Sequence, residues 1–350
     1  MMLDKITSTI LHLSDLHLGE DFADVGSHLK AEGLGIGTVN SFRNNYGLVM
    51  QTHDSWIIPG LQTEIVLAAR YIGAPKDTFD FNVVTGDIST DANPPERFKF
   101  ARDYLIGRTP ISHGSTFKVG LGMPQASLFC VPGNHDKMAL TDNKSYMKGF
   151  KDLPASLPYV KEVVSGRGQR LIFYGIDSNL YLKGNIAVGQ INPGTLAWMN
   201  ERLAEANDDP GPLPVRILLL HHHPADLNQF RPWTLKSLFG SFGKSFSVLQ
   251  EGERLLKACR GRIDIIMHGH EHFPIVFYEK ISSAIVVSSG TSCSYLPKGK
   301  GPNTLHAIAL AGREFQIVQF NWNGARFYPS KEWTGNLSTP AQLKSRILRN

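Results

Sequence analysis

The chain has 350 residues, of which 42% are hydrophobic, and its 36 basic and 31 acidic residues give a formal net charge of +5. It is long enough for one large α/β domain or two small ones. It holds no run of about 18 consecutive apolar residues, which argues against a membrane-spanning helix, and its mild positive charge alone does not indicate a nucleic-acid-binding surface.

The cysteine content favours a reducing compartment. The three cysteines lie far apart and in no metal-binding spacing, which argues against a disulfide framework and a thiolate zinc site. The first residues lack the basic segment and the cleavable apolar stretch of a secretory signal. We therefore expect a cytoplasmic protein.

The first predicted strand covers residues 7–13 and is followed by Asp15 and His17. On an extended segment, residues two apart point to the same side, so these two side chains could bind one ion. Residues 19–60 are rich in glycine and polar residues with little periodicity, which is typical of a long inserted loop. Apolar residues at helical spacing then predict a helix over 61–72.

The second predicted strand, residues 79–84, ends at Gly86, where a glycine allows a sharp turn that presents Asp87. Taken alone, without the other strand ends, Asp87 would be better explained as a helix N-cap. The pattern next predicts a helix over 95–106 and a second Gly-, Pro- and Ser-rich insertion over 107–125.

The third strand begins at Ser127 and is stopped by a Pro-Gly pair. It delivers an amide, an imidazole and a carboxylate in the consecutive positions Asn134, His135 and Asp136. After Pro-Gly these are also ordinary turn residues. Because other predicted strands also end in His or Asp, we interpret these strand ends as parts of one site.

The second half of the chain alternates strands and helices in the same way. The pattern predicts a helix near 141–150, strands over 160–164 and 170–176, a helix over 193–206, a strand over 215–220, a helix over 247–259 and a strand over 263–267. The strand over 215–220 is almost uninterruptedly apolar, as expected of a strand covered on both faces.

Two of these strands end in histidines. Residues 215–220 lead into His221, His222 and His223, which cannot all face one way, so one is expected to bind an ion while the others hydrogen-bond or line the cleft. Residues 263–267 lead into a second group, consisting of His268, His270 and His272. His270 and His272 are two apart, which on an extended segment would point both imidazoles the same way.

The remaining predicted strands are antiparallel and cover residues 275–277, 284–288, 305–310 and 314–320. We expect a single domain over 1–325 with the two insertions near 19–60 and 107–125. Residues 326–350 are expected to form a C-terminal tail whose end caps a terminal helix or frays in solvent.

The histidines gather where strands end, since nine of the 13 lie in the segments His12 to His17, His135, His221 to His223 and His268 to His272. Together with the Asp and Asn residues they supply only nitrogen and oxygen ligands, which suit divalent transition metals such as Mn, Fe or Zn. Counted with one histidine of the triplet, the strand exits offer seven such ligands: Asp15, His17, Asp87, Asn134, one of His221 to His223, His270 and His272. Seven ligands are too many for one tetrahedral zinc ion but about right for two ions that share a carboxylate.

The sequence resembles the calcineurin-like metallophosphoesterases, and its motif wording is most similar to that of class III cyclic-nucleotide phosphodiesterases. The resemblance rests on Asp15-Leu16-His17, Gly86-Asp87, Gly133-Asn134-His135-Asp136, His221-His222-His223 and Gly269-His270-Glu271-His272, which stand in family order. It implies an α/β fold, a four-layer αββα sandwich with two mixed central sheets.

The resemblance also implies roles for these residues. One ion would be held by Asp15, His17, Asp87 and His272, and the second by Asp87, Asn134, His221 and His270, with Asp87 bridging. His135 would stabilise or protonate the departing oxygen, and Asp91 or Asp136 could orient it. His222, His223 and His268 are expected to contact the ligands rather than the ions.

These residues imply a binuclear-metal-dependent phosphodiesterase or phosphomonoesterase, in which a metal-bound hydroxide attacks a small nucleotide-like or organic phosphate. A DNA-processing nuclease of the same family is the alternative, with nucleic acid as a less favoured partner and no membrane contact expected. A scaffold without activity is a third interpretation, although every expected ligand is present. Substrate choice is expected to depend on the two insertions.

Overall fold

We analysed a computed structural model of the chain. It describes residues 5–19, 57–90, 95–110, 118–137, 157–179, 189–205, 213–230, 249–294 and 302–348, together with residues 3 and 116. The predicted helix near 141–150 and most of the predicted insertion over 19–60 lie outside these ranges. Among the described residues, no helix is long and apolar enough to cross a membrane.

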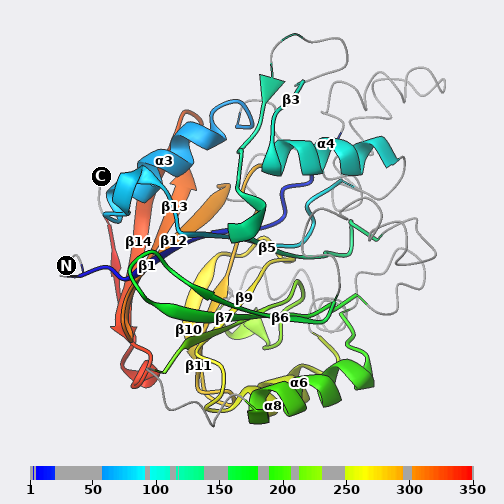
Figure 1. Cartoon of the computed structure of the whole chain (residues 1–350), viewed down its shortest axis with the longest axis vertical. Coiled ribbons are helices and arrows are strands. Elements are labelled where there is room, and N and C mark those ends of the chain that lie inside the picture. Colours follow the sequence, from blue (N-terminus) through cyan, green and yellow to red (C-terminus); the bar gives the residue numbers. More distant parts are fainter. Residues whose placement is uncertain are drawn as a thin grey trace.

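Two mixed sheets form the centre of the molecule (Figure 1). The seven-stranded sheet has the order β15 (Lys344–Ile347), β14 (Phe327–Asn336), β13 (Glu314–Trp322), β12 (Thr304–Ala311), β1 (Ser8–Leu13), β2 (Phe81–Thr85), β5 (Leu128–Val131). The six-stranded sheet has the order β10 (Ile275–Glu279), β11 (Ala284–Ser288), β9 (Ile265–His268), β8 (Val215–Leu219), β7 (Arg170–Gly175), β6 (Tyr159–Val164).

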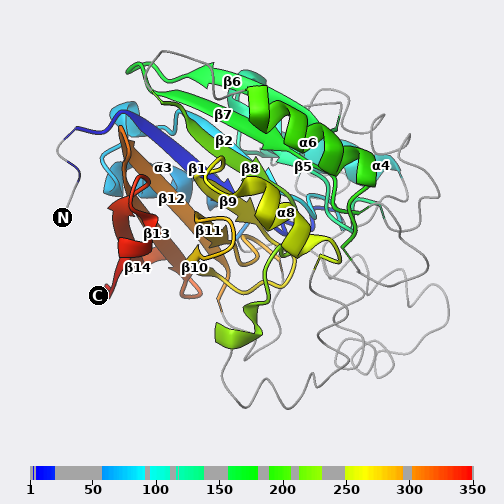
Figure 2. The ribbon, with the colours of Figure 1, turned by 90° about the horizontal axis from the view of Figure 1, so that it is seen from below.

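Helices cover the outer face of each sheet. In Figure 1, α3 (Leu61–Tyr71) and α4 (Pro95–Ile106) lie above the sheets, and α6 (Pro193–Glu205) and α8 (Gly252–Cys259) lie below them. Figure 2 shows α6 and α8 against the six-stranded sheet. The buried apolar side chains accordingly form three clusters, one between the sheets and one under each pair of helices. The predicted four-layer αββα sandwich is confirmed.

The strands that lead to the histidines and aspartates are parallel within each sheet. β1 pairs with β2 and β2 with β5, while β7, β8 and β9 pair in succession in the other sheet. The five residues of β8 are all buried, as an apolar run covered on both faces requires. Since parallel strands have their carboxyl ends at the same edge, the loops that follow them are brought together.

The prediction for the end of the chain was wrong in one respect. The described part of this segment, residues 326–348, is not a loose tail: β14 pairs with β13 and β15 pairs with β14 at the edge of the seven-stranded sheet. Trp333 of β14 is 2% exposed and packs into the cluster between the sheets. Most neighbouring side chains of these edge strands are polar and exposed or half-buried, which is why the segment looks like a tail in sequence.

The predicted insertion over 107–125 contains short regular elements. β3 (Thr109–Pro110) pairs with β4 (Lys118–Val119), and a single 3₁₀ turn, Gln125–Ser127, follows before β5. Met123 and Leu121 donate backbone hydrogen bonds to Leu105 and Tyr104 of α4. The described part of this segment is therefore fastened to α4.

Candidate metal centre

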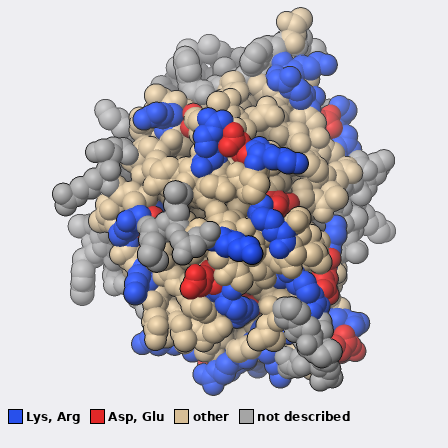
Figure 3. All heavy atoms as spheres, turned by 60° about the vertical axis from the view of Figure 1, so that its left-hand side comes forward, with Lys and Arg blue, Asp and Glu red and all other residues tan. Residues whose placement is uncertain are grey.

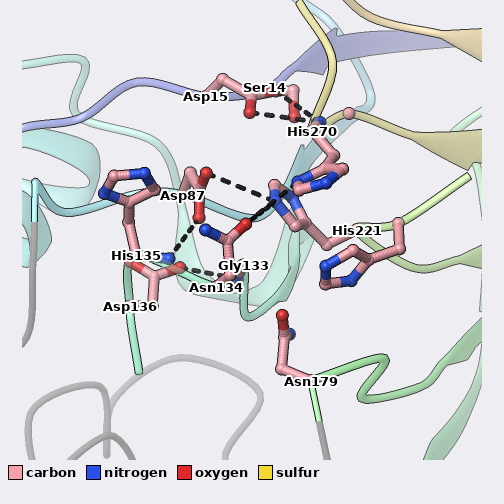
Figure 4. Close-up of polar contacts among 12 residues, drawn as sticks. Ser14, Asp15, Asp87, Gly133, Asn134, His135, Asp136, Asn179, His221 and His270 are labelled. Atoms are coloured by element: carbon pink, nitrogen blue, oxygen red, sulfur yellow. Dashed lines mark hydrogen bonds and ion pairs between the residues drawn. The ribbon is translucent and has the colours of Figure 1, made fainter. Parts of the chain in front are cut away.

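The loops that leave β1, β2, β5, β8 and β9 meet at one edge of the sandwich. Backbone hydrogen bonds join them directly: the N–H of Asp15 donates to the carbonyl of Gly86, and the N–H of Gly269 donates to the carbonyl of His221. Figure 4 shows the side chains that result, which point toward one another from both sheets. Five strand exits that lie far apart in sequence thus form one site.

Asp15, His17 and His272 form the first donor group. Each offers one atom, and these three atoms lie within 4.8 Å of one another. The Nε2 atom of His272 is 3.2 Å from Oδ1 of Asp15. Both ring nitrogens of His17 are buried, and neither has a hydrogen-bond partner within the described residues. Since buried polar atoms rarely lack a partner, this donor set fits a bound cation.

Asn134, His221 and His270 form a second group beside the first. Oδ1 of Asn134 is 3.0 Å from Nε2 of His221 and 3.0 Å from Nδ1 of His270. The other nitrogen of His221, Nδ1, lies 2.7 Å from the carbonyl oxygen of Thr85. Because a carbonyl only accepts, Nδ1 carries a proton there, and Nε2 is the atom that faces the group.

Asp87 lies between these two groups. Its carboxylate can share an ion with His17 and His135, or with Asp15 and His221, judged by the spacing of the donor atoms. Burial acts to raise the pKa of Asp87, but His221, His135 and His17 outweigh it and hold the pKa well below its ordinary value. Burial opposes charge on His221 as well, yet Asp87 raises the pKa of that imidazole to about 9. Asp87 is therefore an ionised carboxylate, the state a metal ligand requires.

His135 is attached to the site at two points. Its backbone N–H donates to Oδ1 of Asp87 over 2.8 Å, and its ring Nδ1 lies 2.8 Å from the carbonyl oxygen of Thr90. Its ring stands edge-on to that of His17, with 4.6 Å between the centroids. The Thr90 carbonyl thus fixes the ring, a role that sequence could not reveal because it belongs to a backbone atom.

Asp136 does not orient His135, in contrast to one of the two predicted options. Its carboxylate accepts hydrogen bonds from the backbone N–H groups of Ile88, Ser89 and Gly133 and from the Ser89 hydroxyl, at 2.8–3.2 Å. Burial and the nearby Asp87 raise the pKa of Asp136 to about 6. Its structural effect is to fasten the loop after β5 to the loop after β2. Asp91, the other predicted option, lies outside the described residues.

Three further histidines from the sequence prediction, His222, His223 and His268, lie beside the donor groups. Nδ1 of His222 is 3.0 Å from Oγ of Ser178, and the His222 ring centroid is 4.3 Å from that of His270. Nδ1 of His223 is 2.9 Å from Nδ1 of His268. None of these three belongs to a donor group within the described part of the chain. Ser178 was not predicted as a site residue, although it also follows a strand.

The backbone at the strand exits is left-handed rather than extended. Five of the predicted ligands have positive φ angles: Asp15, His17, Asp87, His270 and His272, at 46–79°. The rule that residues two apart face the same way therefore does not apply. The ring of His270 contacts Asn134, whereas the ring of His272 contacts Asp15. Such conformations cost about 1–3 kcal/mol each and are characteristic of functional sites.

Two glycines allow the loops to approach this closely. A Cβ atom on Gly133 would lie 2.0 Å from Oδ1 of Asp87, and one on Gly269 would lie 1.8 Å from Oγ of Ser14. At Gly133 a Cβ would also meet the backbone nitrogen of Asp87 at 2.2 Å, and at Gly269 the side chains of Ser14 and Asp15 would have to move. These residues belong to the recognised motifs because the donor groups need this close packing.

A sandwich of two mixed sheets with Asp and His donors at one edge defines the chain as an α/β protein with a candidate metal centre. The sequence profile of the calcineurin-like phosphoesterases matches residues 8–274, and the chain belongs to this family. The predicted family assignment is thereby confirmed. No curated protein matches the chain.

Several solved structures are similar to the chain. One is a conserved protein of Streptococcus pneumoniae TIGR4 described as a predicted phosphoesterase, with 13% identity, 98% of this chain and 99% of that chain covered, and a TM-score of 0.32. Another is a putative 5′-nucleotidase of Staphylococcus aureus, with 12% identity and a TM-score of 0.43. The match covers 98% of this chain and 54% of that chain. A third is Vps29 of Entamoeba histolytica in complex with Zn²⁺, with 8% identity and a TM-score of 0.35. The match covers 94% of this chain and 99% of that chain.

Proposed function

We propose that this protein is a phosphoric ester hydrolase that uses two divalent transition-metal ions to cleave a phosphodiester or phosphomonoester bond of a small nucleotide-like or organic phosphate. The observation that carries the proposal is the position of Asp87, an ionised carboxylate within reach of both donor groups. A carboxylate shared between two sets of nitrogen and oxygen donors is the arrangement that a binuclear centre requires.

In this proposal, Asp15, His17, Asp87 and His272 hold one ion, and Asp87, Asn134, His221 and His270 hold the other. The absence of thiolate donors in both sets favours Mn, Fe or Zn over softer metals. When bound, such a pair of ions supplies positive charge to the phosphate oxygens and lowers the pKa of water toward neutrality. The residues around them have separate tasks.

His135 is the proposed proton donor. Its Nδ1 faces the Thr90 carbonyl, which only accepts, so Nδ1 carries a proton there and Nε2 is the nitrogen left to act on a substrate. The contact of its ring edge with His17 keeps it beside the donor groups. A protonated Nε2 can therefore stabilise or protonate the oxygen that leaves phosphorus.

We favour a small substrate over a nucleic acid, because the formal net charge of +5 is only mildly basic for a chain of 350 residues. Figure 3 draws the side of the molecule on which the termini lie, and there the Lys and Arg side chains are interspersed with acidic and uncharged residues. A nuclease would be expected to use a basic channel and to bind with a steep salt dependence. The cytoplasmic location and the absence of a membrane partner stay predictions.

The test is hydrolysis by protein reconstituted with Mn²⁺, Fe²⁺ or Zn²⁺. Bis(p-nitrophenyl) phosphate, p-nitrophenyl phosphate, cyclic AMP and single-stranded DNA would be compared as substrates. Asp87→Asn should abolish turnover and metal uptake, because it removes the shared carboxylate. Asp77→Asn is the matched control, since Asp77 is an exposed carboxylate paired with Arg70 on the surface.

Turnover of the chromogenic esters or of cyclic AMP, lost in Asp87→Asn and kept in Asp77→Asn, would support the proposal. Cleavage of DNA alone would replace it with the nuclease interpretation. No turnover by protein that holds two metal ions per chain would contradict it and favour a scaffold.

A further inference from the structure

A cavity of about 380 Å³ lies at the exit of β7, the strand that pairs in parallel with β8, whose exit carries His221. It is lined by Leu157, Pro158, Asp177, Asn192, Gly194, Thr195 and Trp198. These residues come from the exit of β7, the residues before β6 and the first turns of α6. The volume lies within the range of small-molecule sites, which is about 300–1,000 Å³.

One wall of the cavity is connected to the loop that carries Asn134 and His135. The carboxylate of Asp177 pairs with the buried ammonium of Lys137, and the N–H of Lys137 donates to the carbonyl of Asn134 over 3.1 Å. Two residues after Asp177, the side-chain amide of Asn179 donates to the carbonyl of Pro132 over 2.8 Å. These contacts join the lining of the cavity to the loop that carries Asn134 and His135.

Asn179 contacts both Asp177 of the cavity lining and Pro132 of the loop that carries the donors. It is 2% exposed and its side chain points toward the histidines of the centre (Figure 4). Its Oδ1 has no hydrogen-bond partner within the described residues. A buried acceptor without a partner costs stability. A donor from a molecule that reaches from the cavity to the centre would satisfy the Oδ1 atom of Asn179.

The lining does not suit a second anionic group. The start of α6 would attract an anion, but Oδ1 of Asn192 already accepts the N–H of Gly194 over 2.8 Å. Asp177 adds a carboxylate, and the ammonium of Lys137 is already paired with it. A neutral group is therefore favoured over a phosphate in this cavity.

The lining does suit a flat ring that bears hydroxyl or amino groups. Trp198 offers an indole, and Leu157 and Pro158 offer further apolar surface. Thr195 offers a hydroxyl. The Asp177 carboxylate accepts from the backbone N–H and side-chain amide of Asn179 and from Lys137, which leaves one of its roughly four acceptor positions for a sugar hydroxyl or a base amine.

We infer that this cavity binds the nucleoside part of a nucleotide substrate whose phosphate lies at the metal centre. The inference rests on the proposed function. It makes Trp198 the residue that stacks on the base or sugar and Asp177 the residue that accepts a hydrogen bond from it. Substrate specificity then depends on the described loop after β7 and on α6, in addition to the predicted insertions.

The test compares two phosphodiesters that share the p-nitrophenol leaving group. One is the p-nitrophenyl ester of thymidine 5′-monophosphate, and the other is methyl p-nitrophenyl phosphate, which lacks a nucleoside. In Mn²⁺-loaded Trp198→Ala, KM for the thymidine ester should rise about tenfold or more, the scale of one lost base–aromatic stack. KM for the methyl ester should stay the same. Trp198→Phe should restore most of the affinity because it keeps an aromatic face.

Trp322→Ala serves as a matched control, since it truncates a partly buried tryptophan that packs on Phe327 in the other sheet. Binding of adenosine and thymidine to metal-free protein would be measured in parallel by calorimetry. This second measurement separates the cavity from the chemistry of the centre.

Nucleoside binding that is lost in Trp198→Ala and kept in Trp322→Ala supports the inference, even if neither ester is hydrolysed and the proposed function fails. Hydrolysis of both esters with an unchanged KM ratio in Trp198→Ala overturns the inference and leaves the proposed function intact. No binding of either nucleoside, together with no preference for the thymidine ester, also overturns it.

Discussion

The backbone N–H of His135 donates a hydrogen bond to Oδ1 of Asp87, 2.8 Å away. This contact attaches the proposed proton donor to the proposed bridging carboxylate through the main chain. The side chain of His135 is therefore not needed to hold Asp87 in place. Binding of metal and transfer of a proton can be separated by mutation.

We expect His135→Ala to keep both metal ions and to lose activity by about 100-fold or more, the scale of one positioned acid. The reason is that alanine keeps the N–H that bonds Asp87. Metal content would be measured by mass spectrometry alongside kcat on bis(p-nitrophenyl) phosphate. Because His135 also belongs to a donor group with His17 and Asp87, loss of one ion would make it a ligand and contradict the proposed role.

Sequence patterns predicted most of the strands and helices and the exits that carry the donors, whereas the four-layer αββα arrangement was implied by the family resemblance. The patterns succeeded because apolar runs with period 2 and helical spacing are local signals, and because parallel strands bring their ends together regardless of sequence distance. Asp15, Asp87 and Asn134 were found for this reason. Edge strand β14 was missed because most of its side chains are polar and give no strand pattern. Only its pairing with β13 identifies it as a strand.

The details of the site depend on contacts that sequence does not encode locally. The left-handed backbone at His17 and His270 replaced the extended geometry that the spacing suggested. The partner of the His135 ring is the Thr90 carbonyl, and a backbone atom leaves no signal in residue type. Asp136 looked like an orienting carboxylate, yet its neighbours are the N–H groups of a loop nearly fifty residues earlier in the chain.

Asp136 is expected to matter for stability rather than for chemistry. Asp136→Ala would leave three buried N–H groups without their acceptor, at about 1–3 kcal/mol each, so we expect a loss of at least about 3 kcal/mol in the free energy of unfolding. Urea denaturation of metal-free protein measures this loss. Asp136→Asn keeps one acceptor oxygen and should lose less. Equal stability of Asp136→Ala and the wild type would show that these hydrogen bonds contribute little.

Gly269 is expected to tolerate no side chain. In Gly269→Ala, the new Cβ would lie 1.8 Å from Oγ of Ser14 and 2.4 Å from Oδ2 of Asp15, so Asp15 must move. We expect a loss of about 1–3 kcal/mol in the free energy of unfolding and weaker metal binding. Gly166→Ala is the control, because nothing lies within 4 Å of its new Cβ. A Gly269→Ala protein with normal metal affinity would mean that the loops can separate without disturbing Asp15.

The last prediction concerns a histidine outside the donor groups. His306 of β12 is fully buried between the sheets, stacked on His12 with 6.1 Å between ring centroids and 6.3 Å from the ring of Trp333. Neither of its ring nitrogens has a hydrogen-bond partner within the described residues. Burial lowers the pKa of His306 from 6.5 to about 3.

In the folded state this ring is therefore neutral down to about pH 3, whereas in the unfolded chain it takes up a proton below pH 6.5. Its contribution to stability is fully present above pH 6.5 and is lost as the pH falls from there toward 3. His306→Phe keeps a ring of similar size and removes this titration. The stability of the wild type relative to His306→Phe should then fall by about 1.4 kcal/mol per pH unit between pH 6 and 4. Urea denaturation of both proteins with a chelator present tests this, and parallel stability curves over that range would contradict it.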